Sequence, residues 1–273
     1  MNEREIRHKF FYAMQEARMY DTTIQLVAPY YREMHEMMLR LAVEGLPDRK
    51  APSDHPLALD IGCGTGEEAI PLLNAISSLR LLGIDLCTPM MDEFRRNAEK
   101  ARMPGDRYHL LVGDILDTSI AQTLKKAAVD RFRGNSFQLI ISAFTLHHLS
   151  TDEKANVFRM AHGLLDDEGV FLLGDLFNYG EESAWLTNNI FTWETNWIAD
   201  NFDKARSKAA SPGNEQAHDD FDRLKEQWLD HYSGENKLDS VTTQMRLLRE
   251  AGFSQVGNPF RYWQVGLVWA RKQ

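Results

Sequence analysis

The chain has 273 residues, 43% hydrophobic and 26% charged; this is enough to bury a sizeable core and excludes disordered, fibrous and disulfide-stapled classes. Its formal charge is −9 at pH 7, without a run of five or more Lys or Arg, which disfavours nucleic acid and favours a small or cationic partner. No apolar run approaches the roughly 20 residues of a membrane helix, and residues 1–5 do not begin a secretory signal, so we expect a cytoplasmic protein with no membrane contact.

The N-terminal fifth of the chain is predicted to be helical. From Ile24 to Leu41, apolar residues recur at alternating intervals of three and four, which is the period of one buried helix face, and Gly45-Leu46-Pro47 ends the pattern. The Pro- and charge-rich stretch that follows indicates a loop. We therefore expect residues 1–50 to form a helical arm or cap.

From residue 56 onward, short apolar runs alternate with helical patterns. The predicted strands are 56–61, 79–84, 108–112, 137–142 and 170–173, and the predicted helices are 67–77, 89–102, 119–127 and 152–165. Strands that alternate with helices are typical of βαβ units, which build a parallel sheet with helices on both faces.

Residues 177–240 interrupt this alternation with two aromatic helix faces, separated by a polar segment, 203–220, that we expect to be mobile. The residues that would line an acceptor pocket are Trp185, Phe191, Trp193, Trp197 and Trp228. Such a face also fits ordinary core packing or a contact in a homodimer. We interpret this segment as a helical lid on the substrate side, inserted into a core of residues 51–176 and 241–273.

The C-terminal residues complete the fold. Residues 242–251 indicate a helix closed by Gly252, and strands 255–263 and 265–270 are so close that only a hairpin joins them. The predicted fold class is α/β: a doubly wound, mostly parallel, seven-stranded Rossmann-like sheet with an antiparallel edge strand, N-terminal helices and a helical insertion after the fifth strand.

A glycine-rich turn between the first strand and its helix carries the strongest chemical signal. In Asp60-Ile61-Gly62-Cys63-Gly64-Thr65-Gly66 the glycines allow a sharp turn and let a ligand approach the main chain. A turn without a ligand needs one glycine and not three. Where dinucleotide-binding turns have their third glycine, this chain has Glu67, and the Glu67-Glu68 pair would repel a pyrophosphate. A ligand with cationic groups and no phosphate, such as S-adenosylmethionine, fits better.

Acidic residues end the next two strands. At the position of Asp85 a carboxylate can accept hydrogen bonds from both ribose hydroxyls, although a helix cap is the alternative. Asp114 can accept from an adenine amino group, and Ile115 can pack on the ring.

Together these motifs resemble the class I S-adenosylmethionine-dependent methyltransferases, over roughly residues 56–176 and 242–271. Residues 141–149 resemble the family's motif after the fourth strand, and 18–24 resemble an arm that folds over the cofactor. The cofactor-binding residues that the resemblance implies are Tyr20, Asp60, Gly62, Cys63, Gly64, Asp85, Leu86, Asp114, Ile115 and Ala143. It implies methyl transfer from S-adenosylmethionine to an O, N, S or C atom of a small-molecule acceptor.

The candidates for a general base are His147 and His148 after the fourth strand, Asp175 at the end of the fifth, and His231 and Tyr232 in the insertion. Of these we single out His148, Asp175 and His231 as the catalytic candidates. In-line displacement depends mainly on positioning, and a base matters when the acceptor is a hydroxyl or a protonated amine. Each candidate also has an ordinary structural interpretation.

No metal is predicted. His147 and His148 are adjacent, which is not the spacing of metal ligands on a helix, and no His-x-x-x-His accompanies them. Cys63 and Cys87 do not form a Cys-x-x-Cys pair, so we expect reduced thiols.

Two other functions stay open. Residues 238–253 and the arm also resemble carboxy-S-adenosylmethionine synthases, which would place the chain in a tRNA-modification pathway. That family holds a carboxylate with an arginine upstream of the Asp-Ser pair, which is Asp239-Ser240 here. Residues 226–238 of this chain contain no arginine, only Lys237. A non-catalytic cofactor-binding domain is the second alternative.

Overall fold

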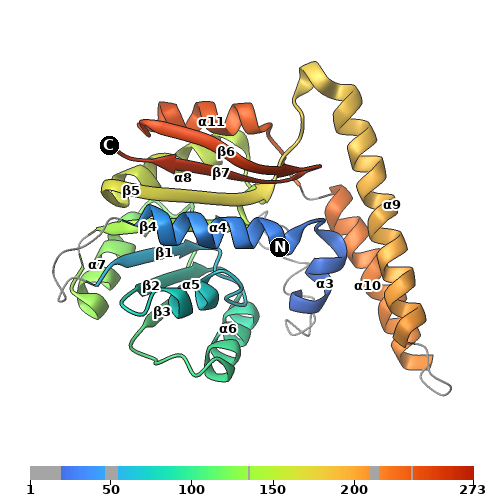
Figure 1. Ribbon diagram of the computed structural model, residues 1–273, viewed down its shortest axis with the longest axis horizontal. Helices are drawn as coiled ribbons and strands as arrows, with labels where there is room; N and C mark the ends of the chain where they lie inside the picture. Colours follow the sequence, from blue (N-terminus) through green and yellow to red (C-terminus); the bar gives the residue numbers. More distant parts are fainter. Residues whose placement is uncertain (1–19, 47–54, 135, 210–214, 235) are drawn as a thin grey trace.

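The computed structural model describes residues 20–46, 55–134, 136–209, 215–234 and 236–273 (Figure 1). Its centre is one sheet with the strand order β3-β2-β1-β4-β5-β7-β6. The strands are β1 (Leu57–Ile61), β2 (Arg80–Asp85), β3 (Tyr108–Val112), β4 (Phe137–Ala143), β5 (Leu165–Leu176), β6 (Gln255–Tyr262) and β7 (Val265–Arg271).

Neighbouring strands from β3 to β5 pair in parallel, whereas β7 is antiparallel to both β5 and β6. The predicted fold class is confirmed, and the reversed strand lies one place in from the edge strand β6. The strand order reverses between β1 and β4, since the chain builds outward from β1 to β3 and then returns. In open α/β sheets, ligands bind at such a switch point, outside the carboxyl ends of the strands.

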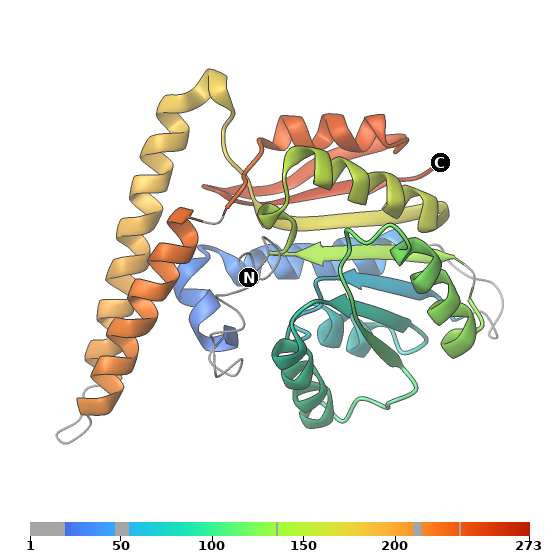
Figure 2. The ribbon, with the colours of Figure 1, turned by 180° about the vertical axis from the view of Figure 1, so that it is seen from behind.

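Helices cover both faces of the sheet (Figures 1 and 2). On one face lie α4 (Tyr31–Gly45), α5 (Ala69–Ala75) and α6 (Thr88–Lys100), and on the other α7 (Ile120–Phe132), α8 (Thr151–Leu164) and α11 (Val241–Glu250). Leu139 and Ile141 of β4 belong to the first hydrophobic core, and Ile140 between them belongs to the second. This alternation buries both faces of a central strand.

The N-terminal helix is broken, which the sequence pattern did not predict. It consists of α3 (Tyr20–Val27) and α4, joined at Tyr30, whose φ of 55° lies in the left-handed region. Pro29 explains the break, because proline lacks an N–H group and disfavours helical geometry in the residue before it. The break turns α3 away from α4 and toward the insertion.

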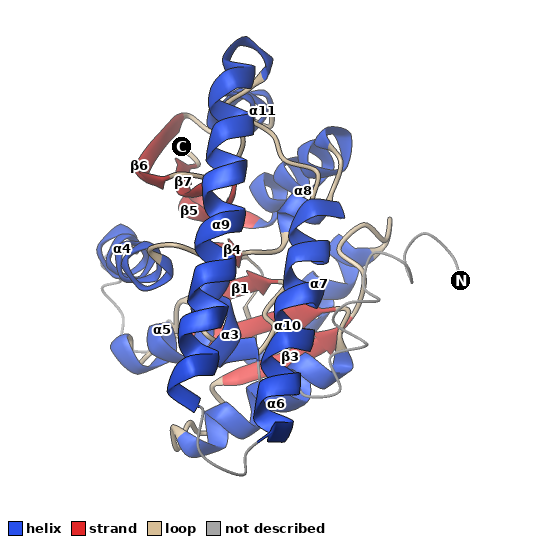
Figure 3. Ribbon diagram, turned by 90° about the vertical axis from the view of Figure 1, so that its right-hand side faces the viewer, coloured by secondary structure: helices blue, strands red, loops and turns tan. Residues whose placement is uncertain are grey.

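The insertion is a hairpin of two long helices, α9 (Ala184–Ala209) and α10 (Glu215–Gly234). It stands across the end of the sheet toward which the parallel strands point (Figures 2 and 3). The polar segment 203–220 is helical over 203–209 and 215–220, and its mobility stays a prediction.

A buried polar network fastens the hairpin to the sheet. Glu194 of α9 accepts hydrogen bonds from the Tyr232 hydroxyl of α10 and, over 2.8 Å, from the backbone N–H of Gln264 before β7. The same hydroxyl oxygen lies 2.9 Å from Gln264 Oε1. Burial raises the pKa of Glu194 to about 7, although these hydrogen bonds act in the opposite direction and lower it. Among the described helices, none is long and apolar enough to cross a membrane.

Candidate functional site

A large cavity lies at the carboxyl ends of β1, β2 and β4, where the topology predicts a ligand. Its volume is about 1090 Å³ with the open solvent at its mouth included, slightly above the ~300–1,000 Å³ usual for small-molecule sites. The predicted cofactor residues that line it are Tyr20, Gly62, Cys63, Gly64, Asp85, Leu86, Asp114, Ile115 and Ala143. The structure thus brings together residues from five separate parts of the sequence, and Asp60 is the one predicted cofactor residue outside this lining.

The glycine-rich turn has the geometry that its composition implies. Gly62, Gly64 and Gly66 have φ angles of 75°, 46° and 88°, a region that side chains disfavour. A Cβ on Gly62 would lie 2.1 Å from Oγ1 of Thr145. The N–H groups of Gly62 and Cys63 both donate to the carbonyl of Ile84, over 2.8 and 3.1 Å. The turn is therefore packed tightly between β2 and the segment after β4.

Asp85 is fixed by the backbone around it. Its Oδ2 accepts from the N–H of Gly64 over 2.8 Å, and its Oδ1 accepts from the N–H of Cys87 over 2.7 Å. Each carboxylate oxygen has a further lone pair. The side chain can therefore both order the glycine turn and accept hydrogen bonds from a bound diol.

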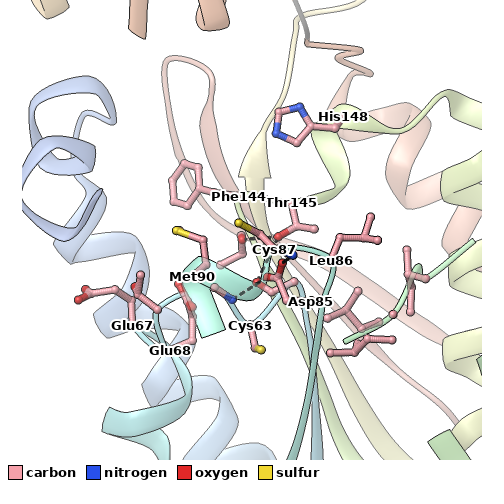
Figure 4. A pocket seen from close by; sticks show the side chains of 18 of the residues that line it. Cys63, Glu67, Glu68, Asp85, Leu86, Cys87, Met90, Phe144, Thr145 and His148 are labelled. Atoms are coloured by element: carbon pink, nitrogen blue, oxygen red, sulfur yellow. Dashed lines mark hydrogen bonds between the residues drawn. The ribbon is translucent and has the colours of Figure 1, made fainter. Parts of the chain in front are cut away.

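The mouth of the cavity is acidic (Figure 4). Burial, with Asp21 and Glu68 adding to it, raises the pKa of Glu67 to about 7. Glu68 forms an ion pair with His35 of α4, and this contact raises the pKa of His35 although burial alone would lower it. Asp21 accepts from Thr65 Oγ1 over 2.5 Å and so joins the arm to the turn. This concentration of carboxyl groups favours a cationic ligand over a phosphate.

Asp60 lies fully buried in β1, beneath the turn. Neither carboxyl oxygen has a hydrogen-bond partner among the described residues. Burial, followed by the charges of Glu68 and Asp85, raises the pKa of Asp60 well above its usual range. A cationic ligand above the turn would lessen the cost of ionising this group, and direct contact between Asp60 and a cofactor stays a prediction.

Tyr20 begins α3 and reaches the cavity from the N-terminal arm. Its ring lies 6.0 Å from that of Trp228 on α10, measured between centroids. Burial and the neighbouring Glu68 raise the pKa of its hydroxyl, which therefore stays protonated and able to donate. The rest of the arm, residues 1–19, lies outside the described part of the chain.

Of the predicted catalytic residues, His148 alone lines this cavity, on the opposite side from the glutamates. His148 belongs to a short turn, η2 (Leu146–His148), and lines the cavity (Figure 4). Oδ1 of Asp175 lies 2.5 Å from Nδ1 of His147, which is hydrogen-bond distance. The ring of His231 lies 5.2 Å from that of His148, which lies 4.0 Å from that of His147.

His147 was offered by the sequence as a possible base but was not preferred over His148. It lies next to His148, but only the fold shows that His147 faces Asp175 across the neighbouring strands β4 and β5. Together with His231 it lines a second cavity of about 390 Å³. Tyr20 and Phe144 line both cavities.

The tryptophans of the insertion behave differently from one another. Trp228 is buried and lines the second cavity. Trp185 and Trp193 are 67% and 44% exposed and line neither cavity, so the aromatic face predicted for α9 does not form the pocket wall there.

Comparisons with known proteins agree with this geometry. Residues 58–169 match the family described as a methyltransferase domain. A carboxy-S-adenosyl-L-methionine synthase of Campylobacter curvus is 22% identical over 175 residues, 64% of this chain and 64% of that protein. A probable tRNA methyltransferase 9B of Mus musculus is 31% identical over 127 residues, 46% of this chain and 22% of that protein. The chain thus spans less than two thirds of either relative.

Among solved structures, magnesium protoporphyrin IX methyltransferase from Synechocystis with bound S-adenosylmethionine superposes with a TM-score of 0.58. The two chains are 13% identical, and the match covers 100% of this chain and 98% of the other. At this identity the match confirms the fold.

Proposed function

We propose that this chain, whose residues 58–169 match the methyltransferase domain family, is a class I S-adenosylmethionine-dependent methyltransferase with S-adenosylmethionine as its cofactor, and that it methylates a small-molecule acceptor. The observation that carries the proposal is the first cavity. Its glycine turn, the fixed Asp85 and the acidic mouth suit a nucleoside that bears cationic groups and no phosphate. When bound, this cofactor supplies an electrophilic methyl group.

The roles of the chain's residues in cofactor binding follow from their places in the cavity. We infer that Asp85 accepts from the ribose hydroxyls, that Asp114 and Ile115 hold the adenine, and that the backbone around Gly62 and Gly64 faces the methionine part. Ala143 and the acidic mouth would lie near the sulfonium. Positioning of this kind can supply up to ~7–11 kcal/mol of the acceleration.

The second cavity is the proposed acceptor site. It adjoins the first through Tyr20 and Phe144, and Trp228 and Leu176 give it apolar walls. His147 would act as the base for a hydroxyl or amine acceptor, because Asp175 holds its Nδ1 and leaves Nε2 as the other proton-accepting atom. His148 and His231 are the further candidates beside it. Free, buried Cys63 and Cys87 support a reducing, cytoplasmic setting.

Transfer of labelled methyl from S-adenosylmethionine into separated small-molecule and RNA pools tests the function. We expect label in one small-molecule fraction and none in RNA. Gly62→Ala is the inactive control, since its Cβ would collide with Thr145 and adopt a disfavoured φ. Gly105→Ala is its matched counterpart, because no atom lies within 4 Å of the added Cβ there. Label in RNA alone would contradict the proposal.

A carboxy-S-adenosylmethionine synthase is the second candidate, favoured by the similarity to the Campylobacter curvus protein. Against it, the arginine expected before Asp239 is absent from residues 226–238. Mass spectrometry of cofactor recovered from the purified protein separates the two: the carboxylated cofactor supports a synthase, and the unmodified one supports methyl transfer. A non-catalytic domain would bind the cofactor and label no fraction.

A further inference from the structure

Three histidines from two distant parts of the chain meet beside the two cavities. His147 and His148 come from the turn after β4, and His231 comes from α10. All three are buried, at 5%, 6% and 7% exposure. One ring nitrogen of each lies within 4.8 Å of those of the other two.

These distances are close to those of a metal-bound set. Two imidazole nitrogens at ~2.0–2.1 Å from a tetrahedral zinc ion lie roughly 3.4 Å apart. Rotation of the rings by about 1 Å at the nitrogen atoms would bring the cluster to that separation. Imidazole is a preferred ligand of divalent first-row transition metals such as zinc.

Asp175 gives the cluster the partner that metal-bound histidines usually have. Its Oδ1 lies 2.5 Å from Nδ1 of His147 and accepts from the N–H of Leu176 over 2.9 Å. Because Nδ1 of His147 faces the carboxylate, Nε2 is the atom left for a metal. A carboxylate that orients a histidine in this way raises its basicity as a ligand, and a cation beyond the ring would balance the buried negative charge.

We propose that His147, His148 and His231 bind one divalent transition-metal ion, zinc in the simplest case, with Asp175 as the residue that orients His147. Three histidines leave a fourth tetrahedral position for water or a substrate atom. His148 lines the first cavity, and His147 and His231 line the second. If the proposed function holds, this position lies on the acceptor side and would take an acceptor oxygen, nitrogen or sulfur atom. With the ion bound, Nε2 of His147 would hold the metal and would not act as the base.

This proposal departs from the prediction made from sequence spacing. Spacing reveals metal sites whose ligands share a helix or a short loop, and here the third ligand comes from the insertion. The fold alone brings His231 to the adjacent pair.

Metal binding can be measured directly on the full chain. The protein is stripped with a chelator and titrated with Zn²⁺ against a chromophoric competitor, and Co²⁺ is added to a second sample. We expect one Zn²⁺ per chain and the intense visible absorption of four-coordinate Co²⁺. Asp175→Asn should weaken Zn²⁺ binding by ~10–100-fold, and His231→Gln should weaken it at least as much. His55→Gln changes an exposed histidine two residues before β1 and should leave Zn²⁺ binding unchanged.

Two results would overturn the site: a wild-type chain that binds no Zn²⁺, or equal Zn²⁺ affinity in the wild type and His231→Gln. The Co²⁺ spectrum of the wild type decides the question even where a variant does not fold. Titration of the zinc-free chain with S-adenosylmethionine separates this proposal from the function. Cofactor binding without metal binding rejects the metal site alone, and metal binding without cofactor binding rejects the proposed function alone.

Discussion

Asp85 holds the backbone at the proposed cofactor cavity. Its two oxygens accept from the backbone amides of Gly64 and Cys87. In Asp85→Asn one of these oxygens becomes an NH₂ group, which faces an N–H donor and can accept nothing from a ribose. We expect the affinity for S-adenosylmethionine to fall at least tenfold, which corresponds to ~1.4 kcal/mol.

Isothermal titration calorimetry with S-adenosylmethionine measures this loss. Asp92→Asn is the matched control, because Asp92 is exposed on α6 and pairs only with Arg95 in the described structure. Equal affinity in the wild type and Asp85→Asn would remove Asp85 from cofactor binding.

The raised pKa of Glu67 leads us to expect that the affinity for the cofactor depends on pH. Its pKa is raised to about 7, mainly by burial, so the side chain ionises between pH 6 and pH 8. The added negative charge at the mouth should strengthen binding of S-adenosylmethionine a few-fold over this interval. S-adenosylhomocysteine lacks the sulfonium charge and should respond less.

Parallel titrations of the two ligands at pH 6 and pH 8 check this difference. In Glu67→Gln the difference in pH response between the ligands should disappear. If the wild type binds S-adenosylmethionine more tightly at pH 6 than at pH 8, the assignment of the acidic mouth to the sulfonium is wrong.

At the scale of elements, the α9–α10 hairpin depends on the buried Glu194. Its pKa in the folded chain, about 7, exceeds its usual value of 4.5 because burial disfavours the charge. The folded state therefore binds this proton more tightly, and the stabilisation is complete below pH 4.5 and is lost as pH rises to about 7. A pKa shift of this size corresponds to roughly 3 kcal/mol in the free energy of unfolding.

The free energy of unfolding of Glu194→Gln should thus exceed that of the wild type at pH 8. The difference between the two proteins should shrink toward pH 5. Denaturant unfolding at both pH values measures it. Glu250→Gln, an exposed residue of α11 paired with Arg246, should show no such pH dependence. A gap that widens toward pH 5 would contradict the account.

Helices and strands could be predicted from the sequence where the spacing of apolar residues marked them. Every strand from β1 to β7 was expected, because apolar runs between turn residues mark buried strands. The break at Pro29 was missed because the apolar period continues across it, and β5 extends to Leu176 because Asp175 and its neighbours pair with β7. The contact between His147 and Asp175 needs the pairing of β4 with β5, which local patterns do not contain.

For the whole molecule, one part of the candidate site could be predicted from the sequence and the other part could not. The predicted cofactor residues sit at strand ends, so the predicted parallel sheet was sufficient to bring Gly62, Asp85 and Asp114 to one cavity. The proposed acceptor side lies between α3 and α10, where Trp228 and Tyr232 contact partners far along the chain. Its residues were therefore named individually but could not be assembled from the sequence.

The net charge of −9 and the acidic cavity mouth lead to the central claim, that the glycine turn holds a sulfonium nucleoside and not a diphosphate. Calorimetric titration of the intact chain with S-adenosylmethionine and, separately, with NAD tests it most directly. We predict one S-adenosylmethionine bound per chain and no measurable binding of NAD. Saturable binding of NAD at the glycine turn, with none of S-adenosylmethionine, would contradict it.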